Sequence, residues 1–350
     1  MTITTPTSTT KTLKSLPRVK SPGWWQMFRA ITDQMNSLEA GRSRYGDNFR
    51  GGAGNLQNYV IFSDPKAIEQ IFTADPNHFD SGIGNTELLP LLGDFSLVLL
   101  DGKSHQKQRK LLMPPFHGER MRAYGRTIYE ITHDVIKKWQ QNQSFEMRKS
   151  TQEITLRAIL HTVFGLDRGE RFEQLRQLLN EWLDIFSSPL KSSFLFFPNL
   201  QKDLGAWSPW GKFVRLRNQI DKLLYAEIDE RKNQPLSDDI LSLMMAARDE
   251  NGESMSDREL RDELMTLLFA GHETTASALA WAFYWIHYQP GVLDKLLDEL
   301  ADCDLENNPS AAIKLPYLDA VCSETLRIYP VAVFTFTRQL KVPMQILDYQ

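Results

Sequence analysis

Apolar residues recur at helical spacing along most of the chain, and only short stretches alternate as strands do. The segments with helical spacing are residues 118–142, 151–163, 168–187, 213–232, 290–302 and 316–328. Asp64-Pro65 predicts one more helix start, with an end near Ala74. Segment 55–63 and the alternating stretch after Pro330 predict strands. The pattern therefore predicts a mainly α fold with a small β-sheet region.

The longest apolar run, residues 264–285, lies inside one long helix. Ser256 and Glu259 form a capping box at its start, and Pro290-Gly291 mark its end. At 1.5 Å per residue this helix is roughly 45 Å long. Its second half is apolar on all sides, so we expect it to pass through the middle of the molecule. The run could just span a bilayer, but the polar residues at its centre favour a buried helix in a protein without a membrane span.

Composition is that of an ordinary globular protein and sets few further limits. Of the 350 residues, 42% are apolar and 24% charged, and the net charge of -4 indicates neither nucleic acid nor an anionic membrane as a partner. The first 22 residues lack an apolar run, so we expect a flexible tail followed by a single domain over 23–350. Two cysteines, Cys303 and Cys322, fit a reducing compartment and a cytoplasmic location.

The polar pair His272-Glu273 interrupts the long apolar helix and invites two interpretations. A zinc-protease helix needs a second histidine four residues after the first, and that position is Ala276, so the metal site is rejected. A carboxylate buried in this helix must be paired, hydrated or protonated. Next to a hydroxyl, as Glu273 is next to Thr274, such a group suits a proton relay.

The same stretch offers a surface for a flat cofactor. Ala270 and Gly271 precede Thr274 by four and three residues, so all three share one side of the helix. Glycine in mid-helix costs about 1 kcal/mol relative to alanine, which suggests a close approach or a local distortion there. An ordinary bond from the Thr274 hydroxyl to the carbonyl of Ala270 stays open as a purely structural role for the threonine.

Two further charged patterns lie on either side of this helix. His105 and Arg109 are four residues apart in GKSHQKQRK, so both point the same way and can grip a carboxylate. Glu324 and Arg327 are three apart on the helix that starts at Pro316, where they can form an ion pair. Either pattern alone could be a solvated helix face.

Together, AGHETT at 270–275, ETLR at 324–327 and DGKSHQKQR at 101–109 resemble the cytochrome P-450 superfamily of haem-thiolate monooxygenases, in its soluble bacterial branch. The resemblance begins near Tyr45 and covers the rest of the chain. It implies haem b as cofactor and insertion of one oxygen atom from O2 into an apolar substrate. It also implies an electron donor of the ferredoxin or flavodoxin type.

The resemblance assigns roles residue by residue. Ala270, Gly271 and Thr274 would line the oxygen pocket, and Glu273 with Thr274 would deliver protons to it. His105 and Arg109 would hold haem propionates, as would Arg338. Glu324 and Arg327 would form a buried structural lock.

The chain departs from the family at its end, because the glycine-rich loop with the cysteine that binds iron is missing. Cys303 follows an acidic stretch without glycines, and Cys322 lies within a helix, so neither is expected to replace that ligand. We therefore expect a C-terminally truncated monooxygenase whose axial cysteine lies beyond Gln350 and which is inactive as written. The alternative is a non-catalytic helical protein that binds apolar ligands or a partner without iron.

The resemblance also carries two less specific expectations. Lys107 and Lys110 would help to dock an acidic electron donor. Residues 88–92, 194–197 and 331–336 correspond to substrate-contacting regions, and their apolar character suggests a fatty acid, an alkane or a terpenoid.

Overall fold

The computed structural model describes residues 14–52, 59–116, 119–185, 193–195 and 197–349. The described chain divides into two compact units. Unit 1 combines the N-terminal region up to Asp80 with residues 338–350, and unit 2 consists of residues 81–337. The single domain expected over 23–350 stays a prediction beside these two units.

In its described residues, unit 1 contains three α-helices and two small antiparallel sheets. Its elements are α1 (Gly23–Thr32), α2 (Gln34–Tyr45), β1 (Asn48–Gly51), β2 (Tyr59–Phe62), α3 (Pro65–Thr73), β3 (Phe79–Asp80) and β4 (Gln339–Leu340). β1 pairs with β2 in the register Asn48 to Phe62, and β3 pairs with β4 in the register Phe79 to Leu340. Helix α3 begins as predicted, because the Asp64 side chain accepts hydrogen bonds from the first free backbone amides.

Unit 2 is helical and carries the predicted site residues except Arg338. Its α-helices are α4 (Leu89–Leu92), α5 (Gly102–Leu112), α6 (Glu119–Ile136), α7 (Met147–Phe164), α8 (Glu170–Asp184), α10 (Pro209–Arg231), α11 (Ile240–Ala246), α12 (Asp257–Tyr288), α13 (Val292–Leu300) and α14 (Pro316–Ile328). Short 3-10 turns lie between them, among them η4 (Leu97–Leu99) directly before α5. The mainly α fold with small sheets is therefore confirmed.

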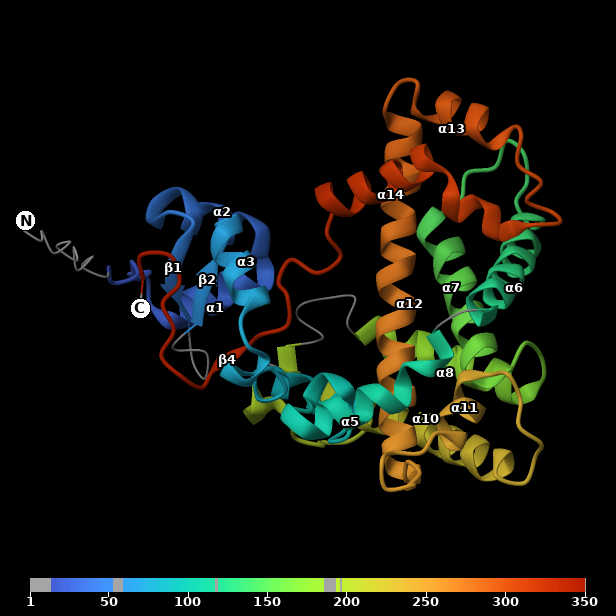
Figure 1. The fold of residues 1–350 in the computed structure, drawn as a ribbon, viewed down its shortest axis with the longest axis horizontal. Helices are drawn as coiled ribbons and strands as arrows, with labels where there is room; N and C mark the ends of the chain where they lie inside the picture. The colour runs from blue at the N-terminus through green and yellow to red at the C-terminus, as the bar shows by residue number, and fades with distance from the viewer. Residues whose placement is uncertain (1–13, 53–58, 117–118, 186–192, 196, 350) are drawn as a thin grey trace, which may run out of the picture. The chain divides into compact units, whose positions relative to one another are not determined.

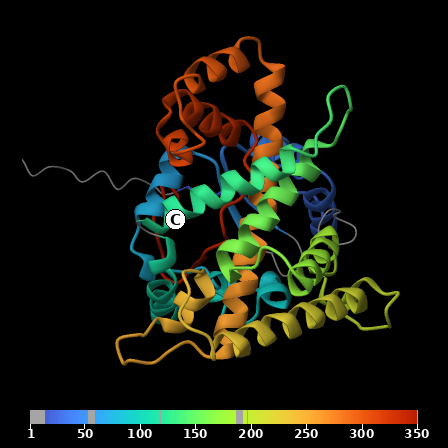
Figure 2. The same cartoon turned by 90° about the vertical axis from the view of Figure 1, so that its right-hand side faces the viewer.

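Helix α12 is the long helix predicted from the sequence, and it organises unit 2 (Figure 1). Its capping box is formed: Ser256 Oγ accepts from the Glu259 amide, and the Glu259 carboxylate accepts from the Ser256 amide at 2.7 Å. Helices α10 and α11 lie near its beginning, and α13 and α14 lie near its end. Figures 1 and 2 both show α7 beside its middle, where the two helices share their most extensive contact.

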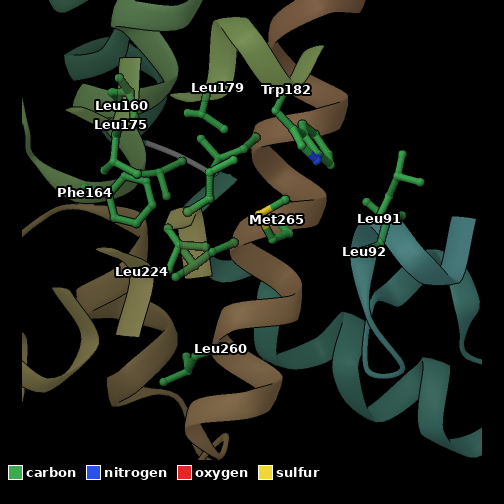
Figure 3. Packing of buried hydrophobic residues seen from close by; sticks show 14 of the residues in the cluster. Leu91, Leu92, Leu160, Phe164, Leu175, Leu179, Trp182, Leu224, Leu260 and Met265 are labelled. Carbon is green, nitrogen blue, oxygen red and sulfur yellow. The ribbon is translucent and has the colours of Figure 1, made fainter. Parts of the chain in front are cut away.

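The core of unit 2 lies around the first half of α12, not the second half as the sequence suggested. Trp182 and Met265 pack there with leucines from α7, α8, α10 and α4 (Figure 3). Beyond Ala276 the residues of α12 are partly or fully exposed. Among the described elements, chiefly α13 and α14 cover that end, so its apolar residues lack the neighbours that would bury them. In the described part of the chain, no helix has the length and apolarity needed to cross a bilayer.

The predicted strands are only partly present. Residues 59–62 of the first are strand β2, and its earlier residues lie outside the described part. The stretch after Pro330 was expected to be a strand, but among its described residues only 339–340 form a strand, which pairs with β3, while Ile346 and Tyr349 form isolated bridges. Alternation alone cannot form a strand where no neighbouring strand accepts its hydrogen bonds. Residues 14–19, expected within a flexible tail, are hydrogen-bonded to β1 and to Asp348.

Candidate active site

Helix α12 presents Ala270 and Thr274 on an exposed face, one turn apart. The Thr274 hydroxyl donates to the carbonyl of Ala270, which is the in-helix bond that the sequence left open. Such a bond holds the hydroxyl against the helix without burying it. Both residues are therefore available to a group lying against this face of α12.

Gly271 allows α7 to pack closely against α12. A Cβ at position 271 would lie 2.9 Å from Cδ1 of Ile159. That contact is tighter than ordinary van der Waals packing, so the missing side chain lets α7 and α12 pack closely. The cost of a glycine in mid-helix thus has a structural cause in this chain, and the role of Gly271 in a cofactor pocket stays a prediction.

Glu273 is ion-paired, which is one of the three states the sequence allowed for it. Its Oε1 contacts the Arg148 guanidinium, and its Oε2 accepts from Gln152 Nε2 at 3.0 Å. Both partners come from α7. The carboxylate is partly buried, with 30% of its side chain exposed. Glu273 is thus held on the α7 side of α12, one residue before the exposed Thr274.

His272 is buried between the same two helices and has a structural partner. Its Nδ1 lies 2.8 Å from Oγ1 of Thr155, and its side chain is 1% exposed. Burial lowers its pKa from 6.5 to about 4, with Arg148 lowering it further and Glu273 opposing the change. The Thr155 hydroxyl also contacts the Thr151 carbonyl at 3.0 Å, an arrangement that suits a neutral ring with its proton on Nδ1 donating to Thr155.

The polar contacts on α7 form a continuous row that we call the α7 polar seam: Arg148, Thr151, Gln152 and Thr155. Thr151 completes the row by donating to the carbonyl of Ala276 at 3.0 Å. Sequence reasoning did not find these residues. Their signal is a polar i, i+3, i+4, i+7 pattern on a helix whose later turns bury leucines.

Helix α5 carries His105 and Arg109 one turn apart, as the spacing predicts. His105 is half-buried, and its pKa is lowered by burial and then by the charge of Arg109, against the opposing effect of Asp101. Arg109 carries a positive charge and the neutral His105 ring can donate an N–H, so the two side chains can bind an anion such as a carboxylate together. This donor set fits a haem propionate.

Two other basic residues of α5, Lys107 and Lys110, form ion pairs with the acidic turn before α12. Lys107 Nζ lies 2.8 Å from the Asp249 carboxylate, and Lys110 Nζ lies 2.6 Å from that of Glu250. These ion pairs raise the pKa of Lys107 and lower those of Asp249 and Glu250. The two lysines are therefore neutralised within the chain, which weakens the expectation that they dock an acidic electron donor.

Arg338 lies in unit 1. Its guanidinium lies 4.2 Å from the ring centroid of Phe72, and Nη1 donates to the carbonyl of Ile71 at 3.2 Å. Both contacts hold the side chain on α3. Its expected role as a propionate ligand stays a prediction.

Glu324 and Arg327 form a bidentate ion pair within α14, with N–O distances of 2.6 and 2.7 Å. The pair lowers the pKa of Glu324 and raises that of Arg327. Both side chains are exposed, so the pair is not enclosed by the elements of unit 2. Its expected role as a buried lock stays a prediction.

The two cysteines are free and lie outside any cluster of candidate metal ligands among the described residues. Cys322 is exposed on α14, and partial burial and nearby Asp319 raise the pKa of its thiol. Cys303 donates weakly to the Glu299 carbonyl at 3.6 Å. Among the described residues, no cluster of three or more His, Cys, Asp or Glu side chains is placed to hold a metal ion. The donors of His105 and Arg109 therefore fit the edge of a haem, whereas an axial cysteine beyond Gln350 stays a prediction.

The apolar segments expected near a substrate divide into buried and exposed residues. Leu91 and Leu92 are core residues, and Phe194 is buried against Trp210 and Phe213. Other residues of these segments are exposed: Leu89, Phe197, Val331, Val333, Phe334 and Phe336. Phe196 lies outside the described residues.

Comparison with known proteins identifies the family. The sequence profile described as "Cytochrome P450" matches residues 17–350. The chain is 35% identical over 337 residues to the putative cytochrome P450 135B1 of Mycobacterium tuberculosis, covering 95% of this chain and 69% of that protein. The chain belongs to the cytochrome P450 family. Membership implies a haem-dependent monooxygenase.

Further cytochrome P450 proteins agree in sequence and in fold. The putative cytochrome P450 138 of Mycobacterium tuberculosis is 34% identical over 307 residues, covering 85% of this chain and 67% of that protein. The structure of the cyanobacterial CYP120A1 with bound retinoic acid aligns with a TM-score of 0.80 at 23% identity, covering 96% of this chain and 74% of that one. The heme domain of cytochrome P450DA aligns with the same score at 21% identity, with the same coverage of both chains.

Proposed function

We propose that this chain holds haem b and contributes the oxygen pocket of a monooxygenase that inserts one oxygen atom from O2 into an apolar substrate. When bound, haem supplies the chemistry of oxygen activation. His105 and Arg109 would hold propionates. The observation that carries this proposal is the arrangement on α12, where exposed Ala270 and Thr274 lie beside a carboxylate held in place by α7.

In this proposal Thr274 and Glu273 handle protons. The Thr274 hydroxyl now donates to its own helix, and rotation of its side chain would free that proton for a group in the pocket. Glu273 is partly exposed, so it can exchange protons with water and pass them to the neighbouring threonine. The α7 polar seam would keep this carboxylate from blocking the pocket face.

The substrate and partners follow from the exposed side chains. We infer an apolar substrate such as a fatty acid, an alkane or a terpenoid, because the large exposed side chains at 331–336 are valines and phenylalanines. Electrons would come from a ferredoxin or flavodoxin type of donor. The low cysteine content supports a cytoplasmic location.

Hemin titration of the purified chain tests the proposal. We expect saturable binding that is weakened by replacing His105 and Arg109 with alanine, whereas the matched exposed pair Lys103 and Gln106 on the same helix should tolerate alanine. We also propose that the chain by itself does not insert oxygen, so the reduced carbon monoxide complex should lack the red-shifted Soret band that a thiolate ligand gives. Absence of hemin binding would refute the proposed function, and a thiolate-type band would refute the proposed lack of activity.

A further inference from the structure

Residues 93–97, just before α5, are tied to the first half of α12 by buried polar contacts, and we call this segment the strap. The Phe95 amide donates to the Asp262 carboxylate at 3.0 Å, and Thr266 Oγ1 donates to Ser96 Oγ at 2.7 Å. Gly93 has φ +92, and a Cβ there would lie 2.1 Å from Oδ1 of Asp262. The close approach therefore requires glycine.

Between these two contacts, α12 buries a carboxyl group with no direct partner. Glu263 is 0% exposed, and neither of its oxygens has a hydrogen-bond partner among the described residues. The same holds for Nε2 of Gln108, a 2% exposed residue of α5. The Gln108 side chain and the Leu97 amide both lower the pKa of Glu263, so both lie close to its carboxyl group. Neither is placed to form a hydrogen bond with that group in the structure. Two buried polar groups thus face each other across a small gap.

The protonation state of Glu263 suits an amide partner. Burial raises its pKa to about 8, with Asp262 and Glu259 of the same helix raising it and Gln108 and the Leu97 amide opposing them. The group is therefore neutral at pH 7. A protonated carboxyl has one donor and one acceptor side, as a carboxamide does. A contact between Glu263 and Gln108, direct or through one water, would satisfy both groups.

The position of this pair connects it to the candidate site. Gln108 directly precedes Arg109 and follows His105 by three residues on α5. Glu263 precedes Ala270 by seven residues, which is nearly two full turns, so both lie on one face of α12, roughly 10 Å apart along its axis. The pair therefore joins the helix of the proposed propionate ligands to the face of the proposed oxygen pocket.

We propose that Glu263 and Gln108 are positioning residues whose carboxyl–amide contact holds α5 on α12 and so fixes His105 and Arg109 beside the pocket face. The role of His105 and Arg109 in this inference rests on the proposed function. The contact itself does not, because it exists in the chain without haem.

Amide hydrogen exchange of the haem-free chain tests the contact. Glu263→Ala should lower the protection factors of α5 by about tenfold, the effect of one lost hydrogen bond, while α8 and α10 keep theirs. Glu263→Gln should restore α5, because a carboxamide is a neutral donor and acceptor. Wild-type protection of α5 should fall between pH 7 and pH 9 as Glu263 ionises, and Glu263→Gln should remove that fall.

Matched variants keep the test decisive if Glu263→Ala fails to fold. Gln108→Leu should loosen α5, whereas Gln106→Leu, at an exposed position two residues away, should not. Equal loss of protection in α8 and α10, no rescue by Glu263→Gln, or the same pH response in wild type and Glu263→Gln would each overturn the inference.

Hemin affinity gives the second readout. Gln108→Leu should weaken hemin binding by about tenfold relative to Gln106→Leu. A displaced α5 would move His105 and Arg109 away from the propionates, and one lost hydrogen bond corresponds to about that change in affinity. Equal hemin affinity of the two variants would overturn the link to the site. If the wild-type chain binds no hemin, the proposed function fails, and hydrogen exchange alone decides the positioning role.

Discussion

Replacement of His272 should remove a large part of the acid sensitivity of this chain. The histidine is buried and neutral in the folded chain, with a pKa near 4, whereas the unfolded chain protonates it near 6.5. Protonating the folded chain therefore costs about 3 kcal/mol more than protonating the unfolded chain. The unfolded state binds the extra proton, so stability is full above pH 6.5 and is lost as pH falls from 6.5 through 4.

The assay is urea unfolding followed by circular dichroism between pH 7.5 and pH 4.5. His272→Asn keeps a neutral side chain that can still bond to Thr155. The variant should lose about 2 kcal/mol less than the wild type over this range. His133→Asn, at an exposed position of α6, is the matched control and should follow the wild type. Glu263 titrates with the opposite sign in this range, and taking the difference between variants cancels its contribution.

Two results would refute this reasoning. One is a stability difference between His272→Asn and the wild type that does not change with pH. The other is an imidazole signal of His272 in nuclear magnetic resonance spectra that titrates near 6.5. The same spectra should show the proton on Nδ1, which suits the contacts of Thr155.

Three further predictions concern stability and can be measured by urea unfolding. Arg231→Ala should cost about 3–5 kcal/mol, because it leaves the buried carboxylate of Asp239 without its cation, whereas Glu227 keeps Arg171; an unchanged midpoint would contradict this. Gly271→Ala should be nearly neutral, since about 1 kcal/mol gained in helix propensity offsets a clash of similar size. Combined with Ile159→Val it should be more stable than the two single effects predict, and strict additivity would argue against the clash. Ser256→Ala should cost about 1 kcal/mol by removing the cap bond to Glu259, and no loss would mean that water replaces it.

The features that could be predicted from the sequence are those that neighbouring residues determine. The cap at Ser256, the helix start at Asp64, and the ion pair between Glu324 and Arg327 all form within one turn of chain. The in-helix bond of Thr274 is of the same kind. Local hydrogen bonding leaves few alternatives at such positions, so pattern and structure agree.

The features that escaped prediction depend on partners far away in sequence. Glu273 is held by Gln152 and Arg148, which lie 121 and 125 positions earlier in the chain. The spacing of residues within α12 cannot predict these partners. Lys107 has the same exposed, basic pattern whether it meets solvent or the acidic turn at Asp249. The residues of α12 that are buried are those with helices packed against them, and the apolar composition of the second half did not predict this.

The contact between α7 and α12 has a consequence for how the chain folds during synthesis. Helix α7 ends at Phe164, and α12 is complete only at Tyr288. At 5–20 residues per second a ribosome needs roughly 6–25 seconds to make the intervening segment. During that time the face of α7 that packs on α12 lacks its partner helix, and Thr151 of the seam lacks the Ala276 carbonyl to which it donates. We expect the nascent chain to depend on chaperones over this interval, and to release them once α12 emerges.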